Sequence, residues 1–104
     1  MKLIIAIVND DDAVNVSTAL NKSGISVTKL ATTGGYLKAG NTTFLIGLDD
    51  HMVDRAVEII GNNAKKRTTT LNDVSPYGKG GTPLEITVGG ATVFVLPVDQ
   101  FLKL

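Results

Sequence analysis

The chain opens with an uninterrupted apolar run at residues 3–8, Leu-Ile-Ile-Ala-Ile-Val. A run of this kind, rich in β-branched residues, is typical of a strand that is buried on both faces. We therefore predict a strand over Lys2–Asn9. Three aspartates, Asp10–Asp12, come directly after it. Carboxylates at this place can cap free amides, and they suit the positive end of a helix dipole.

Two helices are predicted from apolar residues that recur at helical spacing. The first helix follows the aspartates and ends at Gly24, where a left-handed residue belongs; its apolar positions are Ala13, Val16, Ala19 and Leu20. The second helix follows Asp49 and Asp50, which repeat the capping signature. It ends at Gly61–Asn63, and its apolar positions are Val53, Ala56, Val57 and Ile60.

Five further strands are predicted, over about 25–32, 41–48, 65–71, 84–88 and 91–98. The last two are separated by Gly89–Gly90, which indicates a tight turn or a bulge. The segment 75–83 is predicted to be a loop because it is rich in residues that favour turns, namely Pro76, Gly78, Gly80, Gly81 and Pro83.

The element order β-α-β-β-α-β, with the two strand segments on either side of Gly89–Gly90 added at the end, predicts an α+β fold. It is the order of the ferredoxin-like βαββαβ sandwich, in which two helices cover one face of an antiparallel sheet. A length of 104 residues favours a single domain over 1–104. The other face of the sheet is then exposed, and packing against further copies of the chain in a closed ring would bury it. We therefore expect a homo-oligomer.

Composition excludes several classes of protein. Hydrophobic residues make up 43% and charged residues 19% of the chain, so we expect a globular protein. There is no cysteine and one histidine, which excludes disulfides, thiol nucleophiles and metal sites built on several histidines or cysteines. Ten basic and ten acidic residues cancel, so no net field would attract a nucleic-acid polymer or an anionic membrane. The sequence shows no secretory leader and no membrane-spanning run, and we expect a cytoplasmic protein.

The candidate catalytic and metal-binding groups have simpler explanations. Asp10–Asp12 could bind a metal or form an acid/base pair, but consecutive residues at a helix start point in different directions, and capping is the better interpretation. His51 follows two aspartates, yet no motif places a nucleophile beside it. We interpret it as a solvent-facing residue in the first turn of a helix. The sequence therefore predicts no catalytic residue and no metal ligand, and the protein is not expected to be an enzyme.

Residues 32–43, TTGGYLKAGNTT, carry groups that suit a nucleotide. Glycines expose backbone amides, Asn41 and the threonines offer hydrogen bonds, Tyr36 offers a stacking face and Lys38 a positive charge. No acidic residue occurs between Asp12 and Asp49, which is consistent with a surface that receives an anion or with chance in a short chain. An ordinary glycine-rich turn remains the alternative.

The segment 28–45, TKLATTGGYLKAGNTTFL, closely resembles the signature of the PII-like cyclic di-AMP receptor proteins of the PstA type, as do residues 1–8 and 88–98. The resemblance implies a PII-like, ferredoxin-like subunit in a homotrimer, with cyclic di-AMP held in clefts between neighbouring subunits. It also implies a signalling receptor without cofactors, whose loops change conformation on binding and act on a downstream protein that the sequence does not identify.

The ligand contacts implied by the resemblance fall on six positions: Thr28, Gly35, Tyr36, Leu37, Asn41 and Gly47. The chain departs from the family pattern at Gly24 and Ser26, where asparagine and arginine are usual, and its loop 71–83 looks shorter. An arginine at position 26 would supply a planar cation that serine lacks. The alternative is therefore a divergent PII-like paralogue that binds another nucleotide or acts only through protein contacts.

Overall fold

A computed structural model of the protein describes residues 1–30, 40–71 and 84–104, with side chains at all of these positions except 69–71 and 84–88. The elements along the chain are β1 (Lys2–Asn9), α1 (Asp10–Lys22), β2 (Thr28–Lys29), β3 (Asn41–Leu48), the 3-10 helix η1 (Asp50–Met52), α2 (Val53–Asn63), β4 (Arg67–Leu71), β5 (Leu84–Val88) and β6 (Ala91–Pro97).

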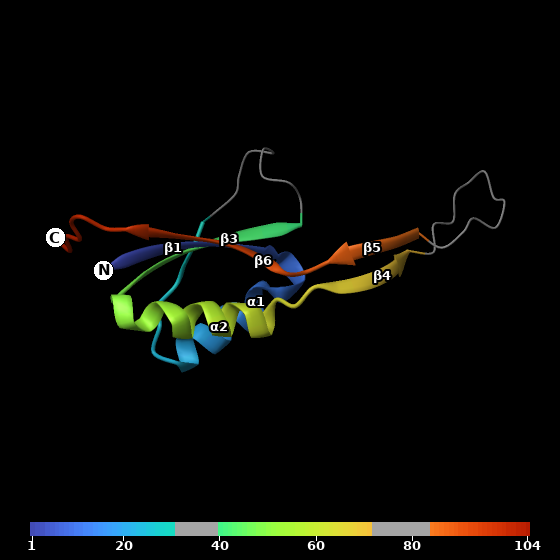
Figure 1. Cartoon of the computed structure of the whole chain (residues 1–104), viewed down its shortest axis with the longest axis horizontal. Coiled ribbons are helices and arrows are strands. Elements are labelled where there is room, and N and C mark those ends of the chain that lie inside the picture. Colours follow the sequence, from blue (N-terminus) through green and yellow to red (C-terminus); the bar gives the residue numbers. More distant parts are fainter. Residues whose placement is uncertain (31–39, 72–83) are drawn as a thin grey trace.

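The main sheet has four strands in the order β2-β3-β1-β6, and every neighbouring pair is antiparallel. Helices α1 and α2 lie together against one face of this sheet (Figure 1). This arrangement confirms the predicted α+β, ferredoxin-like fold. Neither helix of the described residues has the length and apolarity to cross a bilayer.

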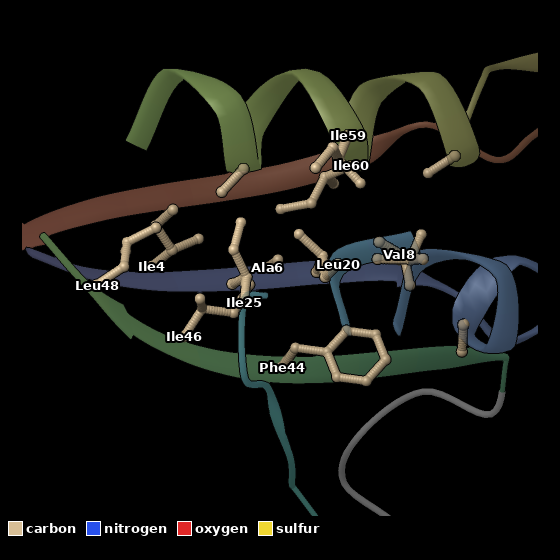
Figure 2. Close-up of a cluster of buried hydrophobic side chains, with 14 residues drawn as sticks. Ile4, Ala6, Val8, Leu20, Ile25, Phe44, Ile46, Leu48, Ile59 and Ile60 are labelled. Carbon is tan, nitrogen blue, oxygen red and sulfur yellow. The ribbon is translucent and has the colours of Figure 1, made fainter. Parts of the chain in front are cut away.

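The hydrophobic core lies between the main sheet and the two helices (Figure 2). Alternate residues of β1 are fully buried in it, and they meet β3 residues such as Phe44 and Ile46 together with helix residues such as Leu20 and Ile60. The sequence prediction that β1 is buried on both faces is wrong for the face that points away from the helices. Leu3, Ile5 and Ile7 are only half-buried, because they point away from the helices.

The face of the main sheet opposite the helices is open and apolar. The pairing register places Ile5 between Leu45 of β3 and Phe94 of β6, and Leu3 beside Leu96. Phe94 is 53% exposed and Leu96 is 40% exposed. The predicted one-sided helix cover is therefore confirmed, and it leaves large apolar side chains in contact with solvent in the isolated chain.

The helix ends differ in detail from the predicted capping pattern. The side chain of Asn9, rather than an aspartate, caps α1 by accepting a hydrogen bond from the Asp11 backbone N–H at 2.9 Å. Gly24 follows the C-cap with φ of +78°, as predicted for a residue that ends a helix. Asp49 precedes η1 without a side-chain capping bond, so the second capping prediction is wrong for the side chain.

The strand predicted over 25–32 is shorter in the structure. Only Thr28–Lys29 form β2, although the Leu30 N–H also donates to Thr43 O at 2.9 Å. Ile25 is instead buried in the core, where it links the end of α1 to the sheet. The final residues of the predicted strand lie outside the described residues, as does the predicted loop 75–83.

Strands β4 and β5 form a separate two-stranded antiparallel sheet, here called the arm. The arm extends away from the end of the main sheet (Figure 1). Gly89 and Gly90 have φ of +83° and +78°, so the chain turns sharply where it leaves the arm and enters β6. The glycine pair that predicted a turn or bulge is therefore the connection between two sheets.

The base of the arm is fixed to the main body by Arg67. Its Nη1 donates to both carboxylate oxygens of Asp12, at 3.2 and 3.3 Å, and to Lys65 O at 3.2 Å. A Cβ atom on Gly89 would lie 2.4 Å from Lys65 O and 2.8 Å from Arg67 Nη1. The glycine is thus required for the arginine to reach α1.

Candidate functional site

The structure describes three of the six predicted ligand contacts, Thr28, Asn41 and Gly47, and all three are exposed. Asn41 is the first residue of β3, and Gly47 lies near the end of the same strand. Thr28 is in β2, directly opposite Leu45. The other three positions, Gly35, Tyr36 and Leu37, lie outside the described residues.

The three described contacts share one face of the main sheet. Leu45 pairs with Ile5 and Gly47 with Leu3, and these β1 residues point away from the helices, so Thr28, Asn41 and Gly47 lie on the open face. Thr28 and Gly47 are diagonal neighbours across β2 and β3, about 7–8 Å apart. Asn41 is six residues from Gly47 along the strand, which corresponds to about 20 Å. Within one chain, these predicted contacts therefore form two groups, with Asn41 in one and Thr28 and Gly47 in the other.

A pocket of about 370 Å³ adjoins Asn41. Its walls are the ends of β1 and β3, the Gly89–Gly90 turn, the start of β6 and the side chain of Lys66. This volume is within the range of small-molecule sites, about 300–1,000 Å³. Of the described contact positions, Asn41 is the one that this pocket contains.

Sequence reasoning missed the other polar groups of this pocket. Lys66 falls in the predicted strand over 65–71 and Asn9 at the end of another predicted strand, yet both line the pocket together with Thr92. The signal that could have found them is the Gly89–Gly90 pair, which brings the chain back beside residues 65–67. Asn9 and Asn41 are paired across β1 and β3, so their side chains lie on the same face.

Asp10 holds Gly40 and Thr42, the residues on either side of Asn41. Its backbone N–H donates to Gly40 O at 2.8 Å, and the Thr42 hydroxyl donates to its carboxylate. Asp12 instead accepts from Arg67 and is 6% exposed. Asp10 and Asp12 therefore hold different segments, and no metal-binding group of carboxylates and histidines occurs among residues 1–30, 40–71 and 84–104.

His51 is exposed in η1, as its sequence position predicted. Its neighbour Asp50 accepts from the N-terminal ammonium of Met1 at 2.8 Å. This hydrogen bond, supported by the positive charges of the amine, Lys2 and His51, holds the pKa of the Asp50 carboxyl below its usual value, although desolvation opposes it. The pair lies at the opposite end of β1 from the Asn41 pocket, and it contributes nothing to that pocket.

A second hollow of about 240 Å³ lies on the helix side of the sheet, between α1 and β2. Val14, Val27 and Phe44 supply apolar walls, and Lys29 lies at its edge. It contains none of the predicted ligand contacts.

The chain is similar to known proteins over nearly its whole length. The model of the cyclic-di-AMP receptor family matches residues 1–104. A crystal structure of a functionally unknown protein from Pediococcus pentosaceus ATCC 25745 is similar to this chain, with 45% sequence identity and a TM-score of 0.75. The similarity covers 99% of this chain and 96% of that one.

Proposed function

Because the chain belongs to the cyclic-di-AMP receptor family, we propose that it binds cyclic di-AMP in clefts between the subunits of a PII-like homotrimer. Binding then rearranges the loops of the receptor, and a downstream protein responds to the new loop conformation. The protein performs no chemistry on the nucleotide and needs no cofactor. It acts in the cytoplasm, where a cyclic dinucleotide would reach it.

The observation that carries this proposal is the distribution of the ligand contacts on the open sheet face. Asn41 lies beside a pocket at one end of β3, whereas Gly47 lies about 20 Å along the strand, and Thr28 is paired with Leu45 beside it. A nucleotide seated beside Asn41 would leave Gly47 of the same chain far from it. A second copy can supply its own Gly47, so a site between subunits uses both groups of contacts.

The exposed apolar residues support self-association through the same face. Phe94 and Leu96 of β6, which lie on the open face, are 53% and 40% exposed, and Phe101 and Leu102 beyond the strand are 62% and 72% exposed. A patch of large apolar residues on one surface is typical of a protein interface. Since α1 and α2 cover only the other face, copies of the chain are the simplest cover, and a closed ring gives every copy the same contacts.

The segment 31–39 connects the proposed ligand contacts to α1. In sequence it leads from β2 to Gly40 and Asn41, and Asp10 at the start of α1 holds Gly40 and Thr42. Gly35, Tyr36 and Leu37 fall in this segment. A nucleotide that contacts these residues would change what the loop presents to a partner, which is the relay step of the proposal.

The alternative, a divergent paralogue with another ligand or with protein contacts alone, rests on Ser26. Ser26 is two residues before Thr28, where β2 begins, and Thr28 pairs with Leu45, two residues before Gly47 in the antiparallel strand β3. A cation at position 26 would therefore be near Gly47, and serine supplies none. Gly24 lies at the helix end with φ of +78°, where its conformation explains the glycine without reference to a ligand.

Isothermal titration with cyclic di-AMP, combined with light scattering, tests the proposal. We expect a trimer that binds one nucleotide per chain, with cyclic di-GMP and ATP bound more weakly. Tyr36→Ala should weaken binding by roughly 1–3 kcal/mol if the aromatic ring stacks on a base, and Tyr36→Phe should bind like the wild type. A monomer, or no saturable binding of cyclic di-AMP, would favour the alternative.

A further inference from the structure

The pocket beside Asn41 has a distinctive set of hydrogen-bonding groups. Its only charged lining residue among the described residues is Lys66, and no carboxylate lines it. The described ion pairs involve Asp12, Asp50 and Glu58 with partners other than Lys66. The ammonium of Lys66 is therefore the charge that this pocket offers to a ligand.

Gly90 makes room for the side chain of Lys66. A Cβ atom at Gly90 would lie 2.8 Å from Lys66 Cγ and 3.3 Å from Cε, so the aliphatic part of the lysine passes directly over the glycine. This packing orders the stem of the lysine beside the pocket. Lys65, the preceding residue, is also exposed but does not line the pocket.

Asn9 can offer its Nδ2 donors to a ligand in this pocket. Its Oδ1 already accepts the Asp11 N–H at 2.9 Å as the cap of α1. The side-chain amide of Asn9 cannot flip without breaking this bond. Its Nδ2 group is therefore the end that can donate to a ligand in the pocket. Together with the ammonium of Lys66, it forms a donor set that suits an acceptor carrying negative charge.

We infer that this pocket receives a phosphate of the bound nucleotide, with Lys66 supplying the charge and Asn9 Nδ2 a hydrogen bond. The identity of the nucleotide rests on the proposed function. The inference adds two ligand contacts, Lys66 and Asn9, to the six positions that the resemblance implied. A base would be held less well here, because its edge carries both donors and acceptors, whereas a phosphodiester carries acceptors alone.

The first test compares two neighbouring lysines. Lys66→Gln should weaken cyclic di-AMP binding by about tenfold to a hundredfold, which is the range of one charge-assisted hydrogen bond. Lys65→Gln removes the same net charge one residue away and should bind like the wild type. Binding by the wild type should weaken with added salt more steeply than binding by Lys66→Gln, since screening acts on the contact that the variant lacks.

The second test uses Asn9→Asp, which keeps the helix cap because aspartate and asparagine cap equally well. It replaces the Nδ2 donors with a carboxylate that repels a phosphate. We expect a loss of at least a hundredfold in affinity, with the melting temperature close to that of the wild type. Asn9→Ser, which keeps a cap but removes the amide, should lose about tenfold.

The outcomes separate this inference from the proposed function. If the wild type does not bind cyclic di-AMP, both fail together. If the wild type binds it, and Lys66→Gln and Asn9→Asp bind as tightly as Lys65→Gln, the proposed function stands and the phosphate pocket is wrong. If all variants weaken equally, the effect is one of overall charge or structure, and the assignment of Lys66 is also overturned.

Discussion

Arg67 at the base of the arm binds both carboxylate oxygens of Asp12, at the start of α1 and 55 residues earlier in the chain. Asp12 is 6% exposed, whereas the side chain of Arg67 is 43% exposed. The arginine therefore serves mainly to pair a buried carboxylate, and in doing so it fixes the arm to the main body. Its neighbour Lys66 packs over Gly90 and lines the pocket at Asn41.

Arg67→Ala should lower the free energy of unfolding by about 1–2 kcal/mol, because a buried carboxylate loses its partner. The partial exposure of the arginine keeps the loss at the low end of the usual range. Urea denaturation would measure it. Arg55→Ala is the matched control, since Arg55 pairs with Glu58 at 3.8 Å on an exposed helix surface, and it should cost less than about 0.5 kcal/mol. Equal losses would contradict the role of Asp12.

Gly89→Ala should destabilise the protein by about 2–4 kcal/mol, because the added Cβ would meet Lys65 O and Arg67 Nη1 and because φ is positive there. Gly61→Ala provides the opposite case. A Cβ on Gly61, within α2, meets nothing within 4 Å, so the substitution should stabilise the helix by about 0.5 kcal/mol. Thermal denaturation of both variants checks the difference in sign.

Ile60→Ala should cost about 2–5 kcal/mol, since Ile60 is fully buried where α2 packs on the main sheet and alanine leaves a cavity. Val57, three residues earlier on the same helix, is 38% exposed. Val57→Ala should therefore cost less than about 1 kcal/mol. Guanidinium denaturation of both variants would measure the two costs, and similar values would mean that α2 does not face the core as described.

The ion pair of Asp50 with the N-terminal ammonium predicts a pH dependence. The pKa of Asp50 is lowered in the folded protein, chiefly by the hydrogen bond from the amine. The stability from this pair is therefore present above the usual aspartate pKa, and it is lost as the pH falls below about 4. Asp50→Asn should lower the melting temperature slightly at pH 7 and leave it unchanged at about pH 2. Asp49→Asn serves as the control, and a difference that persists in acid would contradict the pairing.

Ser26→Arg should tighten cyclic di-AMP binding by about tenfold to a hundredfold, because it restores the planar cation of the family pattern near Gly47. Ser26→Gln is the matched control, with similar length and no charge, and should gain little. Calorimetric titration would measure both affinities. An arginine variant that binds no better than the wild type would indicate a cleft built for a different ligand.

The sequence by itself determined most of the local structure. Periodic apolar residues located α1 and α2, Gly24 marked the end of α1, and the β-branched runs located β1, β3 and β6, because these signals act between residues close along the chain. The segment 28–45 also indicated the family that the full-length match supports. Three of the ligand positions that it implied lie on one face of the sheet, in two separate groups.

Tertiary structure decided what depends on residues far apart in sequence. An apolar run such as Leu3–Val8 does not reveal that one of its faces lacks a covering layer, since that depends on where both helices pack. Charges alone do not reveal that Asp12 pairs with Arg67 rather than capping a helix. The pocket likewise exists because the Gly89–Gly90 turn brings Lys66 beside the paired Asn9 and Asn41. Such contacts depend on how the whole chain packs, and the local sequence pattern does not predict them.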